Sequence, residues 1–388
     1  MESHCAKSAA GGKLPGRLMS QPLTILLAGG GTGGHLYPGI AIAEAIRCRA
    51  PDARLIFLCT NREIDQVILK PTGFESIQQP IVPPRQSISG LLRFFPSWFE
   101  TKELVRRVLA ERKPAAVIGL GGYAAGVAVK LGAQAGIYSL LLNPDVVPGK
   151  ANVYLLPYVR AICCQFQASA DAIKPIYRSK IRVTGCPIRR DIRDLPPRAE
   201  AAGRLGIDPM LNTLVITGAS LGAQTVNEAA LAVFKDLTMN GWQVLHLSGR
   251  DHADSVRAGY RELELAARVV DFTPAMADVW AVADLAISRS GASSCAELTA
   301  CGVPSILMPY PFHKDLHQRK NAAVLMDAGA AIVLDDERDA RRNSEKLRPA
   351  IESLLHDKDR RAAMSVAAKS IAKPDAAETI AQMVIDSL

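Results

Sequence analysis

A glycine-rich segment that ends in a histidine is the part of this sequence best suited to chemistry. Residues 29–35 read GGGTGGH, follow the apolar, strand-like run 25–28, and precede a helix expected to open at Pro38. Glycines allow a tight turn and let backbone N–H groups approach an anion, which the dipole of a following helix also favours. The pattern predicts a phosphate-handling turn with the titratable His35 at its rim. It fits neither a Walker loop nor a strict G-x-G-x-x-G fingerprint, so a sharp turn with a locally packed histidine is the alternative.

Two further glycine turns repeat this arrangement. Residues 119–126 (GLGGYAAG) follow an apolar run at 116–118, and residues 218–223 (GASLGA) follow another at 214–217. Three strand–glycine-turn–helix units are difficult to explain by packing alone. They indicate several loops at the carboxyl ends of strands that a ligand can approach closely.

A run of small residues in the second half suits a nucleotide sugar. Residues 289–297 (RSGASSCAE) follow a strand and open a helix whose first amides can bind a diphosphate. Glu297 lies about a turn inside, where a carboxylate can accept ribose hydroxyls; the alternative is a first-turn acid favoured by the helix dipole. A second helix is expected from residue 313. On it, Gln318 and Asn321 share a face that can bind sugar hydroxyls or simply be polar surface.

The composition is that of an ordinary globular protein with a basic surface. The 388 residues are 48% hydrophobic and 22% charged, with a net charge of +8, which allows two domains with substantial cores. The charge fits phosphorylated substrates or an anionic membrane surface. Nucleic acid is not expected, because only 5% of residues are aromatic and no nucleic-acid motif is present. The eight cysteines form no C-x-x-C pair and no metal-ligand spacing with the seven histidines, which predicts reduced thiols and no metal site.

Apolar runs alternate with amphipathic stretches in both halves, which predicts parallel sheets with crossover helices. Two sets of about six strands indicate two doubly wound α/β domains. A Gly-x-Pro turn at 185–187 and a proline pair at 196–197 mark their boundary. Residues 1–20 are expected to be a disordered extension, and no segment is expected to span a membrane. The expected strands are 24–28, 55–59, 116–118, 138–142, 161–164, 181–184, 213–217, 243–248, 269–272, 285–288, 305–309 and 331–334.

In order and spacing, these motifs resemble those of the MurG family, the UDP-N-acetylglucosamine:undecaprenyl-pyrophosphoryl-muramoyl-peptide N-acetylglucosaminyltransferases. The resemblance covers nearly the whole chain and rests on residues 29–39, 119–126, 184–189 (TGCPIR), 220–223, 289–297, Gln318 and Asn321. It implies a GT-B architecture of two Rossmann-like domains facing a cleft. Residues 21–186 would bind the acceptor and the membrane, and residues 187–375 would bind UDP-GlcNAc, with the last helix, 376–388, packing back on the first domain.

The resemblance also implies the reaction and the residues that perform it. GlcNAc would pass with inversion from UDP-GlcNAc to the muramoyl 4-hydroxyl of lipid I, giving lipid II, without cofactor or metal. Arg189 and Ser220 would contact the diphosphate and Glu297 the ribose, while His35 is the first candidate for the base. The residues expected at the donor are Thr32, Gly33, Gly34, His35, Arg189, Ser220, Thr273, Ala292, Ser293, Ser294, Glu297 and Gln318. Those expected at the acceptor or elsewhere in the cleft are Tyr123, Asn143, Asn227 and Asn321.

One loop departs from the family pattern. Where the family has His-Glu-Gln-Asn, this chain has LNPD at 142–145, so Asn143 replaces the glutamate and Asp145 is the loop's one carboxylate. Asp145 would take over acceptor binding or act as the catalytic base in place of His35, or acceptor handling differs.

Residues 87–113 combine aromatic and basic side chains. Phe94, Phe95, Trp98 and Phe99 are followed by Lys102 and several arginines, which suits an interfacial patch on anionic lipid. The alternative is a helix that buries its aromatic residues in the core. The membrane interpretation predicts a peripheral enzyme at the cytoplasmic face of the inner membrane.

Three other functions remain as rivals. A related GT-B enzyme would glycosylate another lipid such as diacylglycerol, and a UDP-sugar 2-epimerase would share the fold but need no aromatic–basic patch. A non-catalytic UDP-sugar-binding protein would keep the donor pocket and lack transfer.

Overall fold

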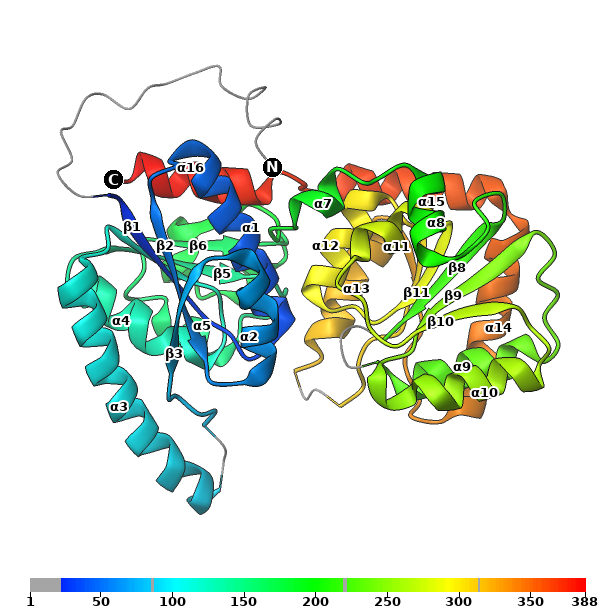
Figure 1. The fold of residues 1–388 in the computed structure, drawn as a ribbon, viewed down its shortest axis with the longest axis horizontal. Coiled ribbons are helices and arrows are strands. Elements are labelled where there is room, and N and C mark those ends of the chain that lie inside the picture. The colour runs from blue at the N-terminus through cyan, green and yellow to red at the C-terminus, as the bar shows by residue number, and fades with distance from the viewer. Residues whose placement is uncertain (1–21, 85–86, 219–221, 313–314) are drawn as a thin grey trace. The chain divides into compact units, whose positions relative to one another are not determined.

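The computed structural model describes residues 22–84, 87–218, 222–312 and 315–388, and these form two compact α/β units (Figure 1). Unit 1 holds the described residues up to Leu142, together with Gly149–Cys163 and Ala377–Leu388. Unit 2 holds Asn143–Pro148 and Cys164–Ala376. The expected extension, residues 1–20, lies outside the described residues.

The first sheet has seven strands in the order β3-β2-β1-β4-β5-β6-β7. The pairs from β3 to β5 are parallel, and the strand order reverses between β1 and β4. In such sheets ligands bind beside the strand ends at the reversal, which here are followed by the glycine turns 29–34 and 119–126. The strands are β1 (Thr24–Ala28), β2 (Arg54–Thr60), β3 (Glu75–Gln79), β4 (Ala116–Gly119), β5 (Tyr138–Asn143), β6 (Ala161–Cys164) and β7 (Ile181–Val183).

Helices cover this sheet and complete the core of unit 1. β1 is buried along its whole length, as expected for a strand of a parallel sheet covered on both faces. The last helix contributes Ile380, Ala381 and Val384 to the same core, and its Gln382 accepts a hydrogen bond from Arg49. Figure 1 shows α3, in cyan, running well beyond the neighbouring α4. The helices are α1 (Gly33–Arg49), α2 (Glu63–Leu69), α3 (Ile88–Arg112), α4 (Gly126–Gln134), α5 (Lys150–Leu155) and α16 (Ala376–Asp386).

The second sheet has six strands in the order β10-β9-β8-β11-β12-β13, all paired in parallel. Its strand order reverses between β8 and β11. The strands are β8 (Asn212–Thr217), β9 (Trp242–Leu247), β10 (Ala267–Val270), β11 (Leu285–Ser288), β12 (Ser305–Leu307) and β13 (Ala331–Val333). The helices are α6 (Ser169–Ala172), α7 (Arg190–Arg193), α8 (Arg198–Leu205), α9 (Gln224–Phe234), α10 (Ala253–Glu262), α11 (Met276–Val282), α12 (Ala292–Cys301), α13 (His317–Asp327), α14 (Ala340–His356) and α15 (Lys358–Ile371).

One strand was not foreseen, and three expectations about element bounds were wrong. The first sheet has a seventh strand, β3, whose ESIQQ sequence is polar because it lies at the sheet edge. α1 begins at Gly33 and carries Pro38 inside it, so Gly33, Gly34 and His35 belong to the first turn of the helix. α13 begins at His317 instead of residue 313, after Leu316 in a left-handed conformation (φ 51°). β10 lies two residues earlier than expected, at Ala267–Val270.

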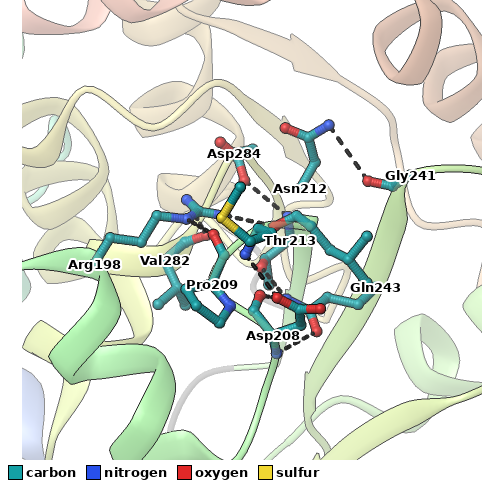
Figure 2. A network of polar contacts seen from close by, with 11 residues as sticks. Arg198, Asp208, Pro209, Asn212, Thr213, Gly241, Gln243, Val282 and Asp284 are labelled. Carbon is teal, nitrogen blue, oxygen red and sulfur yellow. Dashed lines mark hydrogen bonds and ion pairs between the residues drawn. The ribbon is translucent and has the colours of Figure 1, made fainter.

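The amino edge of the second sheet is fastened by a polar network (Figure 2). The guanidinium of Arg198, from α8, donates to the carbonyls of Pro209, Leu211 and Val282 at 2.7–3.1 Å and to the Asp284 carboxylate at 2.8 Å. Asp284 also accepts the backbone N–H of Thr213, at the start of β8, at 2.8 Å. One charge pair therefore joins a helix to the beginnings of two central strands.

Candidate functional site

His35 lies where the first glycine turn enters α1. Its Nδ1 is 3.2 Å from the carbonyl oxygen of Gly30 and 3.3 Å from the hydroxyl of Thr32, the N-cap residue of α1. Because a carbonyl can only accept, the neutral ring carries its proton on Nδ1 and has its basic lone pair on Nε2. Gly33 and Gly34 share this first turn, where backbone amides have no partner within the helix.

The turn after β4 packs against the same histidine. Gly121 and Gly122 have φ angles of +104° and +71°, which favour glycine. A Cβ at either position would come within 3.2 and 3.0 Å of ring carbons of His35. The two glycine turns of unit 1 therefore meet at His35.

Tyr123, the expected acceptor residue, follows directly. Its hydroxyl would lie 3.6 Å from a Cβ on Gly31. Burial raises the pKa of Tyr123, an effect that Arg62 opposes and Asp65 reinforces. Tyr123 is therefore a protonated phenol able to donate a hydrogen bond near the first turn.

Sequence reasoning missed Asp65, which organises the first glycine turn. This fully buried carboxylate accepts the N–H of Gly31 at 2.7 Å, and the N–H and hydroxyl of Thr60 at 2.8 and 2.7 Å. Its Oδ2 lies 2.2 Å from where a Cβ of Gly30 would be, so only glycine fits there. Asp65 follows β2, a neighbour of β1 in the sheet, and that position was the available signal.

The start of α12 forms the corresponding turn of unit 2. α12 begins at Ala292 as expected, with Gly291 as its N-cap and Ser293 and Ser294 in the first turn. Cys186, from the 184–189 segment, lies beside Ser293, and burial raises the pKa of its thiol to about 12. The segment that carries Arg189 is thereby held next to the helix start.

Glu297 and Arg189 lie close together beside this turn. Glu297 accepts a 2.8 Å hydrogen bond from the indole N–H of Trp280. Burial raises the pKa of Glu297, while the Trp280 bond and the charge of Arg189 oppose that rise. Arg189 donates to the carbonyl of Pro274 at 2.8 Å, immediately after Thr273. Thr273, Arg189, Glu297 and the α12 amides, all expected at the donor, are therefore neighbours.

Ser290 is hydrogen-bonded to both polar residues of α13. Its hydroxyl donates to the carbonyl of Gln318 at 2.8 Å, and the Asn321 amide donates to the Ser290 carbonyl at 3.2 Å. The Gln318 side chain accepts the N–H of Tyr310 at 3.0 Å. Gln318 is half-buried at the carboxyl edge of the sheet, whereas Asn321 is fully buried.

The departing loop is bound to α13 through Asn321. Asn321 donates to the Asp145 carboxylate at 2.7 Å and accepts the N–H of Val146 at 2.9 Å. The Asn143 side chain is buried and donates to the carbonyl of Asp145 at 2.8 Å. Asp145 is thus positioned as an anchor of the loop, and Asn143 shapes the loop from within.

Sequence reasoning also missed the ion pair of Arg289 and Asp336. The two side chains are 2.8 Å apart and only 6% and 0% exposed. Arg289 also donates to the Thr225 hydroxyl at 3.0 Å and to the carbonyls of Met308 and Pro309 at 2.9 and 3.2 Å. One guanidinium therefore fixes the loops after β11, β12 and β13 and the first turn of α9.

Asn227 lies inside unit 2. It is 2% exposed, and its amide donates to the carbonyl of Ser248 at 2.9 Å and bonds His246 at 3.0 Å. His246 is also 2.8 Å from the hydroxyl of Tyr260, and burial lowers its pKa to about 3, so it is neutral. Asn227 therefore holds two residues at the carboxyl end of β9 by hydrogen bonds from the interior of unit 2.

The remaining expectations concern ligands and the membrane. Ser220 lies outside the described residues. Within the described ranges, no cluster of three or more His, Cys, Asp or Glu side chains could hold a metal, and seven cysteines are free thiols. No helix in the described part of the chain combines the length and apolarity of a membrane span.

α3 presents an apolar face to solvent. Leu92, Phe95 and Phe99, spaced for one helix face, are 69%, 53% and 58% exposed. The buried face of α3 includes the polar residues Ser97 and Thr101. Because Phe95 and Phe99 are exposed, the alternative that α3 buries its aromatic side chains in the core is wrong for these two residues. Lys102 lies 5.2 Å from the Trp98 ring, and Arg93, Arg106 and Arg107 are exposed. We refer to Leu92, Phe95, Phe99 and these cations as the α3 surface.

Comparison with known proteins identifies both halves of the chain. Residues 25–164 match the glycosyltransferase family 28 N-terminal domain, and residues 213–380 match the glycosyltransferase family 28 C-terminal domain. The UDP-N-acetylglucosamine--N-acetylmuramyl-(pentapeptide) pyrophosphoryl-undecaprenol N-acetylglucosamine transferase of Thermodesulfovibrio yellowstonii is 35% identical, over 93% of this chain and 98% of that protein. The protein of the same name from Halothermothrix orenii is 32% identical over 94% of this chain and 99% of its own length.

Solved structures agree with the fold. Acinetobacter baumannii MurG superposes with a TM-score of 0.72 at 25% identity, covering 94% of this chain and all of that one. A UDP-GlcNAc 2-epimerase from Neisseria meningitidis, at 12% identity and a TM-score of 0.64, shares the fold alone.

Proposed function

The chain belongs to the MurG family within glycosyltransferase family 28, and we propose that it transfers GlcNAc from UDP-GlcNAc to the muramoyl 4-hydroxyl of lipid I, forming lipid II. The observation that carries this proposal is similarity to MurG enzymes over more than nine-tenths of the chain. The geometry adds a glycine turn with a histidine in unit 1 and a helix start with a nearby carboxylate in unit 2.

The donor would bind at the carboxyl edge of the second sheet. The first amides of α12, with Ser293 and Ser294, suit the diphosphate, and Arg189 adds positive charge. Glu297 would accept the ribose hydroxyls, and the backbone at Thr273 would contact the uracil. Gln318 would bind GlcNAc hydroxyls, and Ser220 would join the diphosphate contacts.

Transfer needs a base for the acceptor and charge stabilisation for the leaving group. The muramoyl oxygen attacks the anomeric carbon as the bond to UDP breaks, and UDP leaves with the electron pair, so the centre inverts. The hydroxyl proton passes to Nε2 of His35, while helix amides and Arg189 stabilise the charge on the diphosphate. His35 is favoured over Asp145 as the base because Asp145 accepts from Asn321 and anchors its own loop.

The two halves would divide the substrates. Residues 21–186, with helix 376–388, would form the acceptor- and membrane-binding domain, and residues 187–375 the UDP-GlcNAc-binding domain. Thr32, Gly33, Gly34 and Tyr123 would lie at the reacting centre, and the loop with Asn143 would meet the acceptor. Asn227 and Asn321 would act by supporting the loops that they bond.

The α3 surface would hold the enzyme on the inner face of the cytoplasmic membrane. Exposed aromatic and aliphatic side chains beside cations suit an anionic lipid interface, where each basic residue contributes about 1 kcal/mol. The polyprenyl chain of lipid I would be presented at the same interface.

An acceptor panel tests the reaction. Radiolabelled GlcNAc transfer from UDP-GlcNAc is measured with a short-chain lipid I analogue, with diacylglycerol, and with no acceptor. The proposal expects product with lipid I alone. Product with diacylglycerol instead would make the chain an enzyme of another lipid, and UDP-GlcNAc binding without any transfer would make it a sugar-nucleotide-binding protein.

A further inference from the structure

One peptide group of the first glycine turn is hydrogen-bonded at both ends to side chains that can carry charge. The peptide that joins Gly30 to Gly31 donates its N–H to Asp65 at 2.7 Å, and its carbonyl is 3.2 Å from Nδ1 of His35. A carboxylate, a peptide group and an imidazole therefore form a continuous hydrogen-bonded series.

We propose that Asp65 is a positioning residue for His35 and acts through this peptide group. The carboxylate polarises the peptide, because negative charge at the N–H makes the carbonyl a stronger acceptor. A stronger acceptor at Nδ1 fixes the ring orientation, holds the neutral tautomer with its lone pair on Nε2, and stabilises the imidazolium formed when Nε2 takes a proton.

The surroundings leave Asp65 little freedom to do anything else. Its two oxygens accept from Gly31 and from both donors of Thr60, and the residue is fully buried. The next peptide group of the turn is held by Arg62, which donates to the Gly31 carbonyl at 3.0 Å. A carboxylate that is kept beside glycine backbone, at a position where no Cβ fits, is suited to fixing one peptide in one orientation.

Other titratable groups surround the series. Tyr123, from the turn after β4, interacts electrostatically with Asp65 and with Arg62, which lies at the beginning of α2. Cys59, at the end of β2, also feels the Asp65 charge, and burial with that charge raises its thiol pKa to about 11. Because the pKa values of Tyr123 and Cys59 are both raised, neither group titrates near neutral pH, so a histidine titration in that range does not arise from them.

Histidine NMR on the full chain tests the coupling without any need for turnover. Carbon-labelled histidine is titrated in the wild type and in Asp65→Asn, with the His35 signal assigned by its loss in His35→Gln. The amide keeps an oxygen for Gly31 but removes the charge, so the His35 pKa is expected to fall by at least about 0.5. Asp284→Asn is the matched control, because Asp284 also accepts a backbone N–H but belongs to unit 2. It is expected to leave the His35 titration unchanged.

Kinetics provide a second measurement, and this one rests on the proposed function. In Asp65→Asn we expect kcat to fall about 10- to 100-fold with KM for UDP-GlcNAc nearly unchanged, and the acidic limb of the kcat profile to move to lower pH. The limb moves in that direction because a less stabilised imidazolium loses its proton more readily.

Two results would overturn the inference. One is a His35 titration in folded Asp65→Asn that coincides with the wild type; the other is a fall in kcat with an unmoved acidic limb. If the wild type transfers no GlcNAc, the NMR result still decides the coupling, so failure of the proposed function is distinguishable. The melting temperature and the far-UV circular dichroism spectrum report whether the Asp65→Asn variant is folded. If it is not, Asp65→Glu replaces it.

Discussion

Two arginine–aspartate pairs stand at opposite ends of the same short strand, β11. Asp284 precedes the strand and pairs with Arg198, and Arg289 follows it and pairs with Asp336. The first pair is 33% and 28% exposed and joins α8 to strand beginnings. The second is 6% and 0% exposed and joins three loops and the first turn of α9 at the carboxyl edge.

The difference fits the proposal that the donor binds at the carboxyl edge of this sheet. At the amino edge, a partly solvated pair fastens α8 to the beginnings of two strands that already pair in the sheet (Figure 2). At the carboxyl edge, a desolvated pair holds loops that have little regular structure of their own. A buried pair contributes little net stability but is costly to break, so its presence there fits a positional role.

Breaking the buried pair is the largest effect expected. Arg289→Met leaves Asp336 buried without its charge partner, which costs about 3–5 kcal/mol of unfolding free energy and disorders the loops around α12. Urea unfolding and calorimetric titration with UDP-GlcNAc measure both. A variant that unfolds and binds like the wild type would show that the two edges do not differ as described.

The pH dependence of the same pair follows from Asp336. Burial alone would raise its pKa, but hydrogen bonds from Thr225, Asn343, the Arg338 N–H and Arg289 lower it below 3.8. A lowered pKa gives stability that is present above pH 3.8 and is lost as pH falls through the folded value. Acid unfolding of Asp336→Asn should therefore lack a stability loss below about pH 4 that the wild type shows.

Glu297 gives a further test of the carboxyl edge, because its charge is expected to favour donor binding but to lower stability. Because the pKa of Glu297 is raised in the folded protein, its charged form lowers the free energy of unfolding at neutral pH. This loss disappears as the pH falls through the raised pKa towards the ordinary value of 4.5. Glu297→Gln should weaken UDP-GlcNAc binding about tenfold, as expected for loss of a charged hydrogen bond, while the melting temperature stays level or rises. An unchanged affinity for UDP-GlcNAc would show that Glu297 does not bind the ribose.

The exposed pair at the amino edge gives a smaller, purely structural effect. Asp284→Asn should lower the free energy of unfolding by about 1–2 kcal/mol through its weakened bonds to Arg198 and Thr213. Both KM values should stay within error of the wild type in steady-state assays. A changed donor KM would mean that the two edges are coupled.

Substitutions on the α3 surface should leave the stability nearly unchanged and should weaken membrane binding instead. Phe95→Ser with Phe99→Ser should change the free energy of unfolding by less than about 0.5 kcal/mol, because both rings are exposed. Sedimentation with phosphatidylglycerol vesicles should fall several-fold, whereas Val366→Ser, at an even more exposed apolar position on α15, should bind as the wild type. If both variants bound the vesicles equally well, the α3 surface would not be the part of the protein that binds the membrane.

Local patterns predicted the strands and turns that carry the site, since apolar runs and glycines act over a few residues. They could not reveal Asp65, which lies 34 residues from Gly31, or Asp336, which lies 47 residues from Arg289, because those pairings arise only from strand order. Two errors were local. Proline suggested a helix start that the structure places at Gly33, and the polar edge strand β3 has no apolar pattern.

The most direct measurement compares GlcNAc transfer to a lipid I analogue by the wild type and His35→Gln, with UDP-GlcNAc affinity measured for both. We expect transfer by the wild type, a loss of about 10²- to 10⁴-fold in kcat for the variant, and the same donor affinity. Transfer by His35→Gln at the wild-type rate would contradict the account, because the two glycine turns would then surround a histidine that takes no part in the reaction.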